Sequence, residues 1–386
     1  MRKFYTAEAV TEGHPDKLCD QIADAILDVC LKQDEQSRVA CEVLATKGNI
    51  IVAGEITSTY EPDVFAVVRK VLADVGYSGE GITMDTFVHQ QSSDIAGAVD
   101  TSKERREGVS DNQMDWFQGA GDQGVMIGYA CDETKQLMPM PVVLANRIVR
   151  ELSACRQSSY IQGILPDGKA QVTVEYENGK PVRLDSVVVS CQHTEDKNLK
   201  KLEAEIRKKV LLPALRLLPP DEDTKILSNP SGRFVCGGLD ADTGLTGRKL
   251  MVDSYGSMVP HGGGAFSGKD CSKVDRSAAY MARYIAKNIV AAGLASKCQV
   301  SLAYAIGVAQ PVMVQVDTFG TGKVCADDCL ELAIPLVFGL TPKQIVDSLR
   351  LTRPIFRQTA AFGHFGRKEF PWERTDKVEA LRNAVI

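Results

Sequence analysis

A chain of 386 residues with 44% hydrophobic and 25% charged side chains can form two or three domains with sizeable cores. Its formal net charge of −5 argues against a nucleic-acid partner held by overall electrostatics. No run of about 18 apolar residues predicts a membrane span and the charged N-terminus is unlike a signal peptide, so we expect a cytoplasmic protein with no membrane partner. The 11 cysteines lack C-x-x-C spacing, which favours reduced, buried thiols over zinc sites or disulfides.

The first hundred residues predict an α+β unit. Residues 18–31 carry apolar side chains at helical spacing, and 63–75 are expected to form a second helix after a proline. Two runs rich in β-branched residues, 38–46 and 50–58, predict strands joined around Lys47–Gly48. Residues 94–119 then lose all periodicity and are polar and charged. Such long segments are usually linkers or lids, and composition alone favours a linker.

The rest of the chain again mixes strand and helix patterns. Asn178–Gly179 between two alternating apolar runs is the clearest hairpin signal in the chain. The other predicted elements are a helix over 141–154, a strand over 185–190, a charged helix over 198–212, strands over 300–309 and 312–319, and a helix from Thr341. The predicted fold class is therefore α+β, with no internal repeat evident in the text of the sequence.

A glycine-rich segment, HGGGAFSGKDCSKVDR from His261 to Arg276, contains the phosphate-loop pattern G-x-x-x-x-G-K. Asp270 stands where that loop needs Ser or Thr for magnesium, and no clean apolar strand precedes it. Ser272 is expected to begin a helix with Asp275 as the acid of a capping box. The expected apolar stripe is Val274, Ala278, Met281, Ile285 and Ile289, and Gly293 is expected to end the helix. Backbone N–H groups, Lys269 and Lys273 would favour a polyphosphate there.

A second candidate site is the motif Gly13-His14-Pro15-Asp16-Lys17. Pro15 suits a first helical turn, so His14 should lie near a helix N-terminus that favours anions. Asp16 is a hard oxygen ligand suited to Mg²⁺, or merely a carboxylate that favours the helix dipole. The motif alone leaves both readings open.

Two carboxylates lie on the predicted strands around Lys47–Gly48. If Thr46 pairs with Asn49, Glu42 and Glu55 project from one face as diagonal neighbours. A loop with one residue more or fewer would place them on opposite faces. On one face, they either face solvent or hold a cation.

Other glycine-rich segments contain acids and bases. Arg248 and Lys249 end the run 240–249 and could bind phosphates, and Arg233 precedes an aromatic residue that could stack on a base. Asp122, within 119–124, is a candidate cation or ribose ligand, whereas 166–169 may be only a turn. The sequence shows no serine elbow, Cys/His pair or activated lysine, so this inventory favours polyphosphate chemistry by positioning and charge neutralisation.

The motifs GHPDK, GAGDQG, D-x-G-L-T-G-R-K and GGGAFSGKD, in this order, resemble the S-adenosylmethionine synthetase (methionine adenosyltransferase) family. The likeness extends to the C-terminal GHFGRKEFPWERTDK. It implies three similar α+β domains, each with strand hairpins and two helices, about a pseudo-threefold axis. The implied ranges are 1–102 for the N-terminal domain, 103–118 for a lid loop, 119–232 for the central domain and 233–386 for the C-terminal domain. The resemblance allows strands to be exchanged between these units.

The resemblance also implies a reaction, in which the sulfur of L-methionine attacks C5′ of ATP. The expelled tripolyphosphate would then be hydrolysed to phosphate and pyrophosphate, and the product would serve one-carbon metabolism. Two Mg²⁺ and one K⁺ would be needed at each site. The active sites would lie between subunits of a homodimer, which often pairs into a homotetramer.

Residue roles carried over by motif are expectations of the same kind. The expected catalytic residues are His14, Lys169, Arg248 and Lys269. The expected ATP-binding residues are these four with Asp167, Arg233, Phe234, Asp242, Lys249 and Ala265. The expected methionine-binding residues are Glu55, Gln91, Asp122, Asp242 and Lys273. Asp16 and Asp275 would bind Mg²⁺, and Glu42 would bind K⁺.

Two other functions compete with this expectation. An ATP-dependent kinase or ligase would release ADP or AMP, and Asp270 argues against its phosphate loop. A non-catalytic nucleotide-binding module would bind ATP without methionine-dependent turnover. We expect the synthetase.

Overall fold

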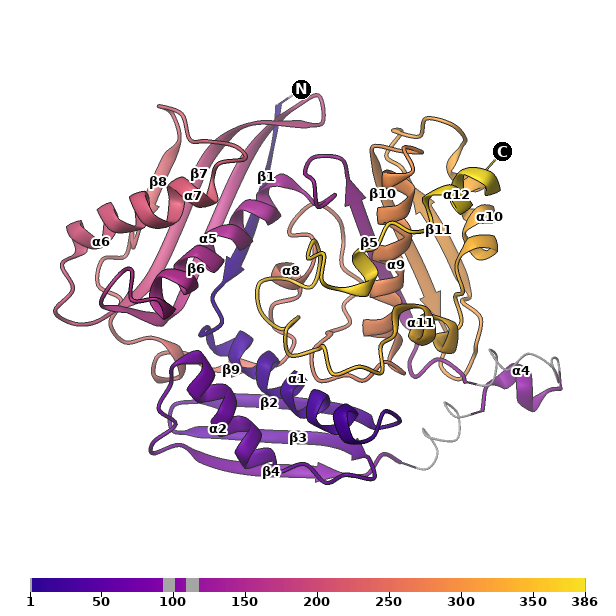
Figure 1. Cartoon of the computed structure of the whole chain (residues 1–386), viewed down its shortest axis with the longest axis horizontal. Coiled ribbons are helices and arrows are strands. Elements are labelled where there is room, and N and C mark those ends of the chain that lie inside the picture. Colours follow the sequence, from indigo (N-terminus) through magenta and orange to yellow (C-terminus); the bar gives the residue numbers. More distant parts are fainter. Residues whose placement is uncertain (1, 93–100, 109–117, 386) are drawn as a thin grey trace.

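The computed structural model describes residues 2–92, 101–108 and 118–385. Three sheets form the framework, each with helices packed against it (Figure 1). The α+β fold class is confirmed.

The first sheet has the strand order β4 (Thr83–His89), β3 (Asn49–Thr57), β2 (Arg38–Thr46) and β9 (Gly244–Leu245). Helix α1 (Pro15–Gln33) packs on β2 and β9, and α2 (Val64–Val75) packs on α1. Thr46 pairs with Asn49, and Glu42 and Glu55 pair with Ala53 and Ala40, so the even loop is the alternative that holds and both carboxylates project from one face.

Local sequence explains where these two helices begin and end. His14 is the N-cap of α1, and Pro15 occupies the first turn, where a missing N–H is harmless. Asp63 caps α2 by accepting a hydrogen bond from the N–H of Ala66, and Gly76 ends it in the left-handed region at φ 103°.

The second sheet has the order β1 (Arg2–Val10), β6 (Ile164–Glu177), β7 (Lys180–His193) and β8 (Lys225–Ser228). Asn178 and Gly179 both have positive φ, as the predicted two-residue hairpin requires. Helix α5 (Met140–Gln157) packs on β1 and β6. The predicted charged helix is α6 (Leu199–Glu205) followed by a π-helical turn, Ile206–Leu211, and the short α7 (Leu212–Ala214).

The third sheet has the order β11 (Met313–Asp317), β10 (Lys297–Tyr304) and β5 (Gly124–Cys131). It packs against α9 (Val274–Ala291), which α11 (Pro342–Leu349), α12 (Val378–Ala384) and a 3₁₀ turn (Pro371–Glu373) also contact. Helix α10 (Asp327–Val337) lies against β11 and α12. The remaining short elements are α4 (Lys103–Arg106), α8 (Leu250–Asp253) and a 3₁₀ turn (Gly238–Asp240).

Strands pair across long stretches of sequence. The N-terminal β1 pairs with β6, β5 pairs with β10, and β9 pairs with β2. Each sheet therefore includes a strand from a distant part of the chain. The sequence boundaries at 102, 119 and 233 stay a prediction.

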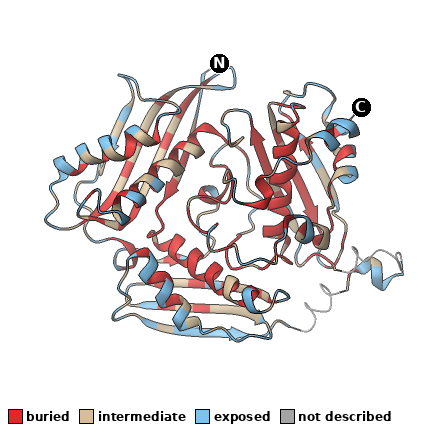
Figure 2. Cartoon of the chain, in the orientation of Figure 1, coloured by how far each residue is buried: buried red, intermediate tan, exposed pale blue. Residues whose placement is uncertain are grey.

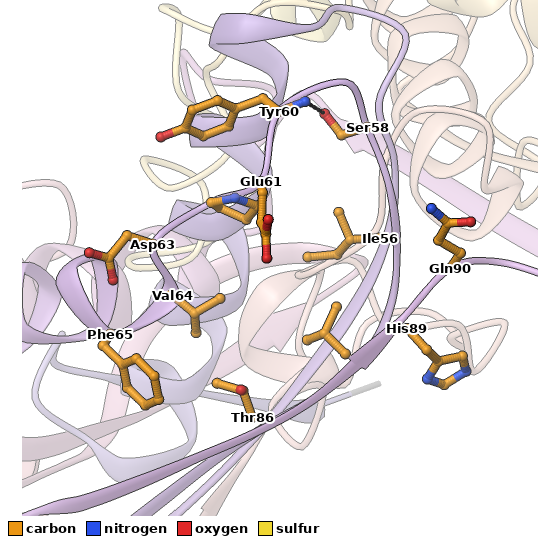
Figure 3. Close-up of a pocket in the computed structure, with 12 residues that line it drawn as sticks. Ile56, Ser58, Tyr60, Glu61, Asp63, Val64, Phe65, Thr86, His89 and Gln90 are labelled. Carbon is orange, nitrogen blue, oxygen red and sulfur yellow. Dashed lines mark hydrogen bonds between the residues drawn. The ribbon is translucent and has the colours of Figure 1, made fainter.

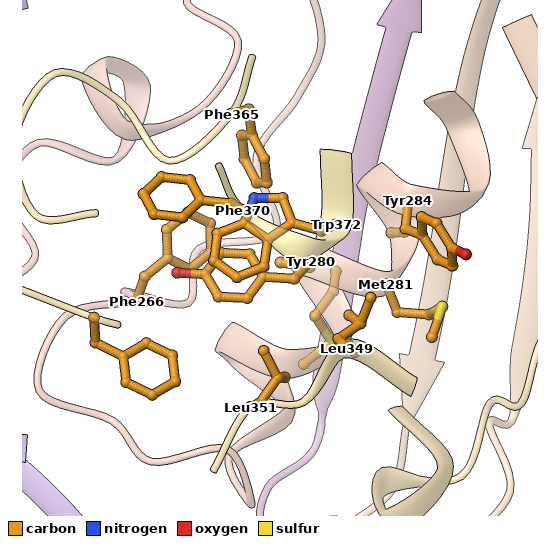
Figure 4. Packing of buried hydrophobic residues seen from close by; sticks show 14 of the residues in the cluster. Phe266, Tyr280, Met281, Tyr284, Leu349, Leu351, Phe365, Phe370 and Trp372 are labelled. Carbon is orange, nitrogen blue, oxygen red and sulfur yellow. The ribbon is translucent and has the colours of Figure 1, made fainter. Parts of the chain in front are cut away.

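The hydrophobic core has two parts. One surrounds α5, β6 and β7, and a larger one joins the first and third sheets through α1 and α9, which are the most completely buried helices (Figure 2). At one end of the larger core Trp372 stacks on Tyr280 with ring centroids 3.7 Å apart and on Phe370 at 4.9 Å (Figure 4). The Trp372 indole N–H donates to the carbonyl of His364, which satisfies the polar atom of a fully buried ring.

The predicted apolar stripe of α9 is buried, and Gly293 follows the helix in the left-handed region. The predicted start is wrong. The helix begins at Val274 with Lys273 as N-cap and has no side-chain cap. Asp270 explains the difference, because its carboxylate accepts hydrogen bonds from the N–H groups of Ser272 and Val39, which fixes the turn before the helix.

No single described helix is long and apolar enough to cross a membrane. One bent pair, α10 with α11, passes that test by length and composition only.

Candidate active site

A cluster of charged side chains surrounds the N-terminus of α1. The imidazole Nδ1 of His14 accepts a hydrogen bond of 3.2 Å from the N–H of Asp16. The Asp16 carboxylate, almost fully buried, lies 2.5 Å from Lys249 Nζ and 3.4 Å from Arg248 Nε. Four of the predicted residues thus meet here, although about 230 positions separate the two pairs in sequence.

The electrostatics of this cluster favour a neutral His14. Burial and the positive charge of Lys249 lower the pKa of His14 to about 4, with Lys169 acting in the same direction and Asp16 and Asp242 opposing. Because Nδ1 accepts the N–H of Asp16, the ring proton belongs on Nε2. Burial would raise the pKa of Asp16, but Lys249 and the N–H of Leu245 hold it below its usual value.

We expect the His14 ring to remain uncharged between pH 5.5 and 8. Its ring-proton NMR signals should titrate near pH 4, and the pKa should rise in Lys249→Ala, which removes a nearby positive charge. A His14 titration midpoint near pH 6.5 in the unmodified protein would contradict this assignment.

A second set of predicted residues lies in the glycine-rich loop. Lys269 Nζ lies 2.6 Å from the Asp275 carboxylate. The same lysine is close enough to Glu42 to oppose the rise in the pKa of that carboxyl that burial causes. A Cβ on Gly247 would lie 2.6 Å from that of Ala265, so the loop touches the segment that carries Arg248 and Lys249. Only glycine permits this approach with φ at 76°.

Four aspartates of α1, spaced four residues apart, hold the loops of both sets. We call Asp16, Asp20, Asp24 and Asp28 the aspartate row. Their carboxylates accept hydrogen bonds from the N–H groups of Leu245, Gly247, Gly268, Phe356 and Arg357. The sequence motifs indicated only Asp16, although the i, i+4 spacing of the four aspartates is visible in the sequence.

A buried lysine forms ion pairs with the aspartate row and with a neighbouring segment. Lys17, fully buried, bridges Asp20 at 2.7 Å and Asp253 at 2.5 Å. Burial disfavours its charge, but the two carboxylates outweigh this and raise the pKa of Lys17. Because Asp253 ends α8, just after Lys249, this network fixes the segment that carries Arg248 and Lys249 to α1. Deeper in the row, Asp24 forms a buried two-point ion pair with Arg276 at 2.6 and 2.8 Å.

The predicted methionine-binding residues are spread over several elements. Glu55 lies 3.2 Å from His89 Nε2 at the end of β3, and the N–H of Gln91 donates to Thr57. Lys273 is ion-paired with the buried Asp270. Asp122 is exposed and accepts a hydrogen bond only from its neighbour's N–H among the described residues. No hydrogen bond or ion pair joins these groups to one another within the described chain.

The remaining predicted ATP-binding residues lie on β6 and the loop after β8. Lys169 pairs with Glu8 at 2.5 Å, a partner that sequence analysis missed. Asp167 accepts a hydrogen bond from the N–H of Gly238, and burial raises its pKa. Arg233 is exposed and pairs with Glu195 at 2.7 Å. The N–H of the neighbouring Phe234 donates to His193 Nε2.

An open pocket of about 550 Å³ lies at the carboxyl ends of β3 and β4, beside the start of α2. Ile56, Val64 and Glu61 point toward one space, whereas His89 lies at its edge (Figure 3). None of the predicted site residues lines it. The charged cluster at α1 is therefore the better candidate for the chemistry.

The described residues contain no group of three or more His, Cys, Asp and Glu side chains placed to hold a metal. Asp16 and Asp275 are each ion-paired with a lysine. Mg²⁺ usually takes only one or two protein carboxylates and fills its octahedron with water and substrate phosphates. The residues therefore fit a metal that arrives with a nucleotide rather than a preformed cage.

Three family models match the chain in succession. The S-adenosylmethionine synthetase N-terminal domain matches residues 2–102, the central domain 117–234 and the C-terminal domain 236–374.

Proposed function

The chain belongs to the S-adenosylmethionine synthetase family and is a methionine adenosyltransferase, and from this premise we propose how its residues carry the reaction. The enzyme makes S-adenosylmethionine from ATP and methionine. In the proposed route the methionine sulfur forms a bond to C5′ while the bond from C5′ to its oxygen breaks. The electron pair goes to that oxygen, which leaves with the whole triphosphate; hydrolysis to phosphate and pyrophosphate follows.

The observation that carries this route is the neutral His14 beside a group of cations. A thioether has no proton to lose, so the attack needs no general base and catalysis depends on stabilising the leaving oxygen. With Nδ1 occupied by the Asp16 N–H, Nε2–H can donate to that oxygen. Arg248, Lys249 and Lys169 supply positive charge around it, and Lys269 extends this along the glycine-rich loop.

Members of this family use divalent and monovalent metal ions. We propose that Asp16 and Asp275 bind two Mg²⁺ and that Glu42 contributes to one K⁺ site. Bound magnesium would neutralise charge on the phosphate oxygens. The lysines now paired with Asp16 and Asp275 would then turn to the phosphates.

The scattered methionine-binding candidates support a site completed by a second copy of the chain. We propose a homodimer or a homotetramer built from such dimers, in which Glu55 and Gln91 of one subunit face Asp122 and Lys273 of the other, with Asp242 near the ribose. Arg233, Phe234 and Asp167 would contact the nucleotide. The cytoplasm remains our expectation for its location.

We also propose that residues 103–118 act as a lid, although 109–117 lie outside the described residues. Of the described part, the N–H of Lys103 donates to Gly307, and the Glu104 carboxylate accepts hydrogen bonds from Ala309 and Gln310. Closure over the site would exclude water that could attack C5′ in place of sulfur.

Mass analysis of products tests the proposed route. Incubation with ATP, methionine, Mg²⁺ and K⁺ should yield S-adenosylmethionine, phosphate and pyrophosphate, with no ADP. In ¹⁸O-labelled water, one labelled oxygen should enter either phosphate or pyrophosphate, because hydrolysis of the triphosphate chain breaks one P–O bond and adds water at the attacked phosphorus. ADP or AMP as the stoichiometric product would overturn the route and favour the kinase or ligase reading.

Asp275→Asn tests the magnesium assignment. The variant keeps the shape of the side chain and has no side-chain capping hydrogen bond to lose, because α9 is capped by Lys273 without one. We expect the Mg²⁺ concentration for half-maximal turnover to rise about tenfold or more, since a metal-binding carboxylate is lost. An unchanged Mg²⁺ dependence would leave Asp275 only as the ion-pair partner of Lys269.

A further inference from the structure

A small pocket between α5 and the segment 362–367 has an unusual concentration of positive charge. Three arginines line it, Arg147 and Arg150 from α5 and Arg367 from the facing segment, and none of its described lining residues is acidic. We call this the arginine pocket. Its volume is about 70 Å³, well above the roughly 10–15 Å³ that one water needs on the same measure. It therefore has room for a small oxyanion.

The guanidinium groups are held in place by backbone carbonyls and rings. Arg147 donates to the carbonyl of Pro213, Arg150 donates to that of Phe362, and Arg367 donates to those of Gln358 and Ala361. Arg150 also lies over the ring of Phe362, 5.7 Å from its centroid. Each group keeps further N–H donors for a ligand, because a guanidinium carries five.

These positive charges are poorly compensated. Arg367 pairs with Glu369 at 2.9 Å, but no ion pair with a carboxylate involves Arg147 or Arg150 in the described chain. Removal of the Arg150 guanidinium from water and repulsion by Arg367 lower the pKa of Arg150 to about 10, and the carboxylate of Glu369 opposes this only in part. An anion in the pocket would remove this repulsion.

A second observation comes from the other wall of the pocket. Asn146 lines it, and its Nδ2 donates to the carbonyl of Val142. Its Oδ1 is buried and has no hydrogen-bond partner among the described residues. A buried carbonyl oxygen without a donor is costly. A ligand here should thus both accept from arginines and donate to Asn146.

We propose that the arginine pocket binds one hydrogen-phosphate ion. Its unprotonated oxygens accept charge-assisted hydrogen bonds from the arginines, and its hydroxyl donates to Asn146 Oδ1. Inorganic phosphate keeps a hydroxyl at neutral pH, sulfate has none, and a phosphate monoester loses its own above a pKa of about 6. The ion would tie α5 to a segment whose His364 N–H donates to Asp253, at the end of α8.

The site is independent of the proposed catalytic route and can be tested apart from it. Inorganic phosphate is titrated calorimetrically at pH 7.5 into the full-length Lys249→Ala protein, in which the α1 cluster is weakened. Adding Arg150→Ala should weaken phosphate binding about tenfold or more, because charge-assisted hydrogen bonds are lost. Adding Arg69→Ala, which removes an exposed arginine from α2, should not.

Two further arms test the chemistry of the ligand. Inorganic phosphate should bind at least about fivefold more tightly than sulfate or methyl phosphate, because only the first donates a hydrogen bond at this pH. Equal binding of all three, or tighter binding of methyl phosphate, would overturn the assignment to hydrogen phosphate. Phosphate affinity unchanged by Arg150→Ala, with the melting temperature in phosphate-free buffer also unchanged, would overturn the site itself.

Discussion

Lys17→Met should lower the free energy of unfolding by about 3–5 kcal/mol at pH 8, the range found when one partner of a buried ion pair is removed. Lys17 is fully buried between the carboxylates of Asp20 and Asp253. Methionine is of similar length but leaves both carboxylates without a counter-charge. Chemical denaturation of the full-length chain measures the effect.

The loss should depend on pH. In the unmodified protein burial already raises the pKa of Asp253 to about 7, and removal of Lys17 would raise it further. A carboxyl whose pKa is higher in the folded state than in the unfolded state binds protons on folding, so stability rises as the pH falls toward the unfolded value. Lys17→Met should therefore lower the free energy of unfolding less at pH 6 than at pH 8.

A second variant separates charge from packing. Adding Asp253→Asn to Lys17→Met removes one of the two uncompensated carboxylates and should recover part of the lost stability at pH 8. No recovery, or a loss below about 1 kcal/mol in the single variant, would show that the network contributes little. Lys70→Ala, an exposed position on α2, is the control and should stay within about 0.5 kcal/mol.

Lys249→Ala should reduce kcat/KM for S-adenosylmethionine formation by about 10²–10³, the usual effect of removing one group that stabilises developing charge. Most of the loss should appear in kcat, because the charge on the leaving oxygen is greatest in the transition state. Initial rates at saturating methionine and varied ATP measure both parameters.

Stability should change far less than activity in this variant. Asp16 would keep its hydrogen bond from Leu245 and its contact with Arg248. Because Asp16 is buried but keeps these two partners, we expect a loss of about 1–2 kcal/mol, below the roughly 3–5 kcal/mol found when a buried charge is left without a partner. A fall of less than fivefold in kcat/KM would remove Lys249 from the proposed role, whereas a global loss of stability would make the kinetic result uninformative about charge.

Short-range chemistry in the sequence predicted the local structure well. The Asn178–Gly179 turn and the start of α1 follow from residues with narrow backbone preferences, whereas the sequence leaves the register of β2 and β3 open between an even and an odd loop. The capping box predicted at Ser272 does not form. The sequence indicates Asp270 only as a departure from the phosphate-loop pattern, but its carboxylate fixes this turn by accepting a hydrogen bond from the N–H of Val39 on β2.

Long-range pairing was not predictable in the same way. Nothing local in β1 indicates that its partner is β6, about 165 positions away. Helix α10 was also missed. Its outward residues Leu332 and Leu336 are 74% and 78% exposed, and Pro335 interrupts it, so its pattern does not separate a buried from a solvent face.

In the candidate site, too, the local motifs were predictable from the sequence and the long-range contacts were not. Family motifs named most of the charged residues, but not the pairing of Lys169 with Glu8 or the bridge made by Lys17. In the sequence, Asp20, Asp24 and Asp28 have the spacing of the polar face of an amphipathic helix. They are buried only because loops from distant parts of the chain cover them, which no local pattern reports.

The aspartate row sets the spacing of the loops that bind along α1. Each step of four residues advances about 6 Å along a helix and turns it by about 40° beyond one full turn, so the four carboxylates meet loops at fixed intervals. One residue inserted between Asp16 and Asp20 would rotate every later carboxylate by about 100° and shift it 1.5 Å relative to His14. Loop lengths elsewhere can drift among relatives, whereas the length of α1 between Asp16 and Asp28 should not.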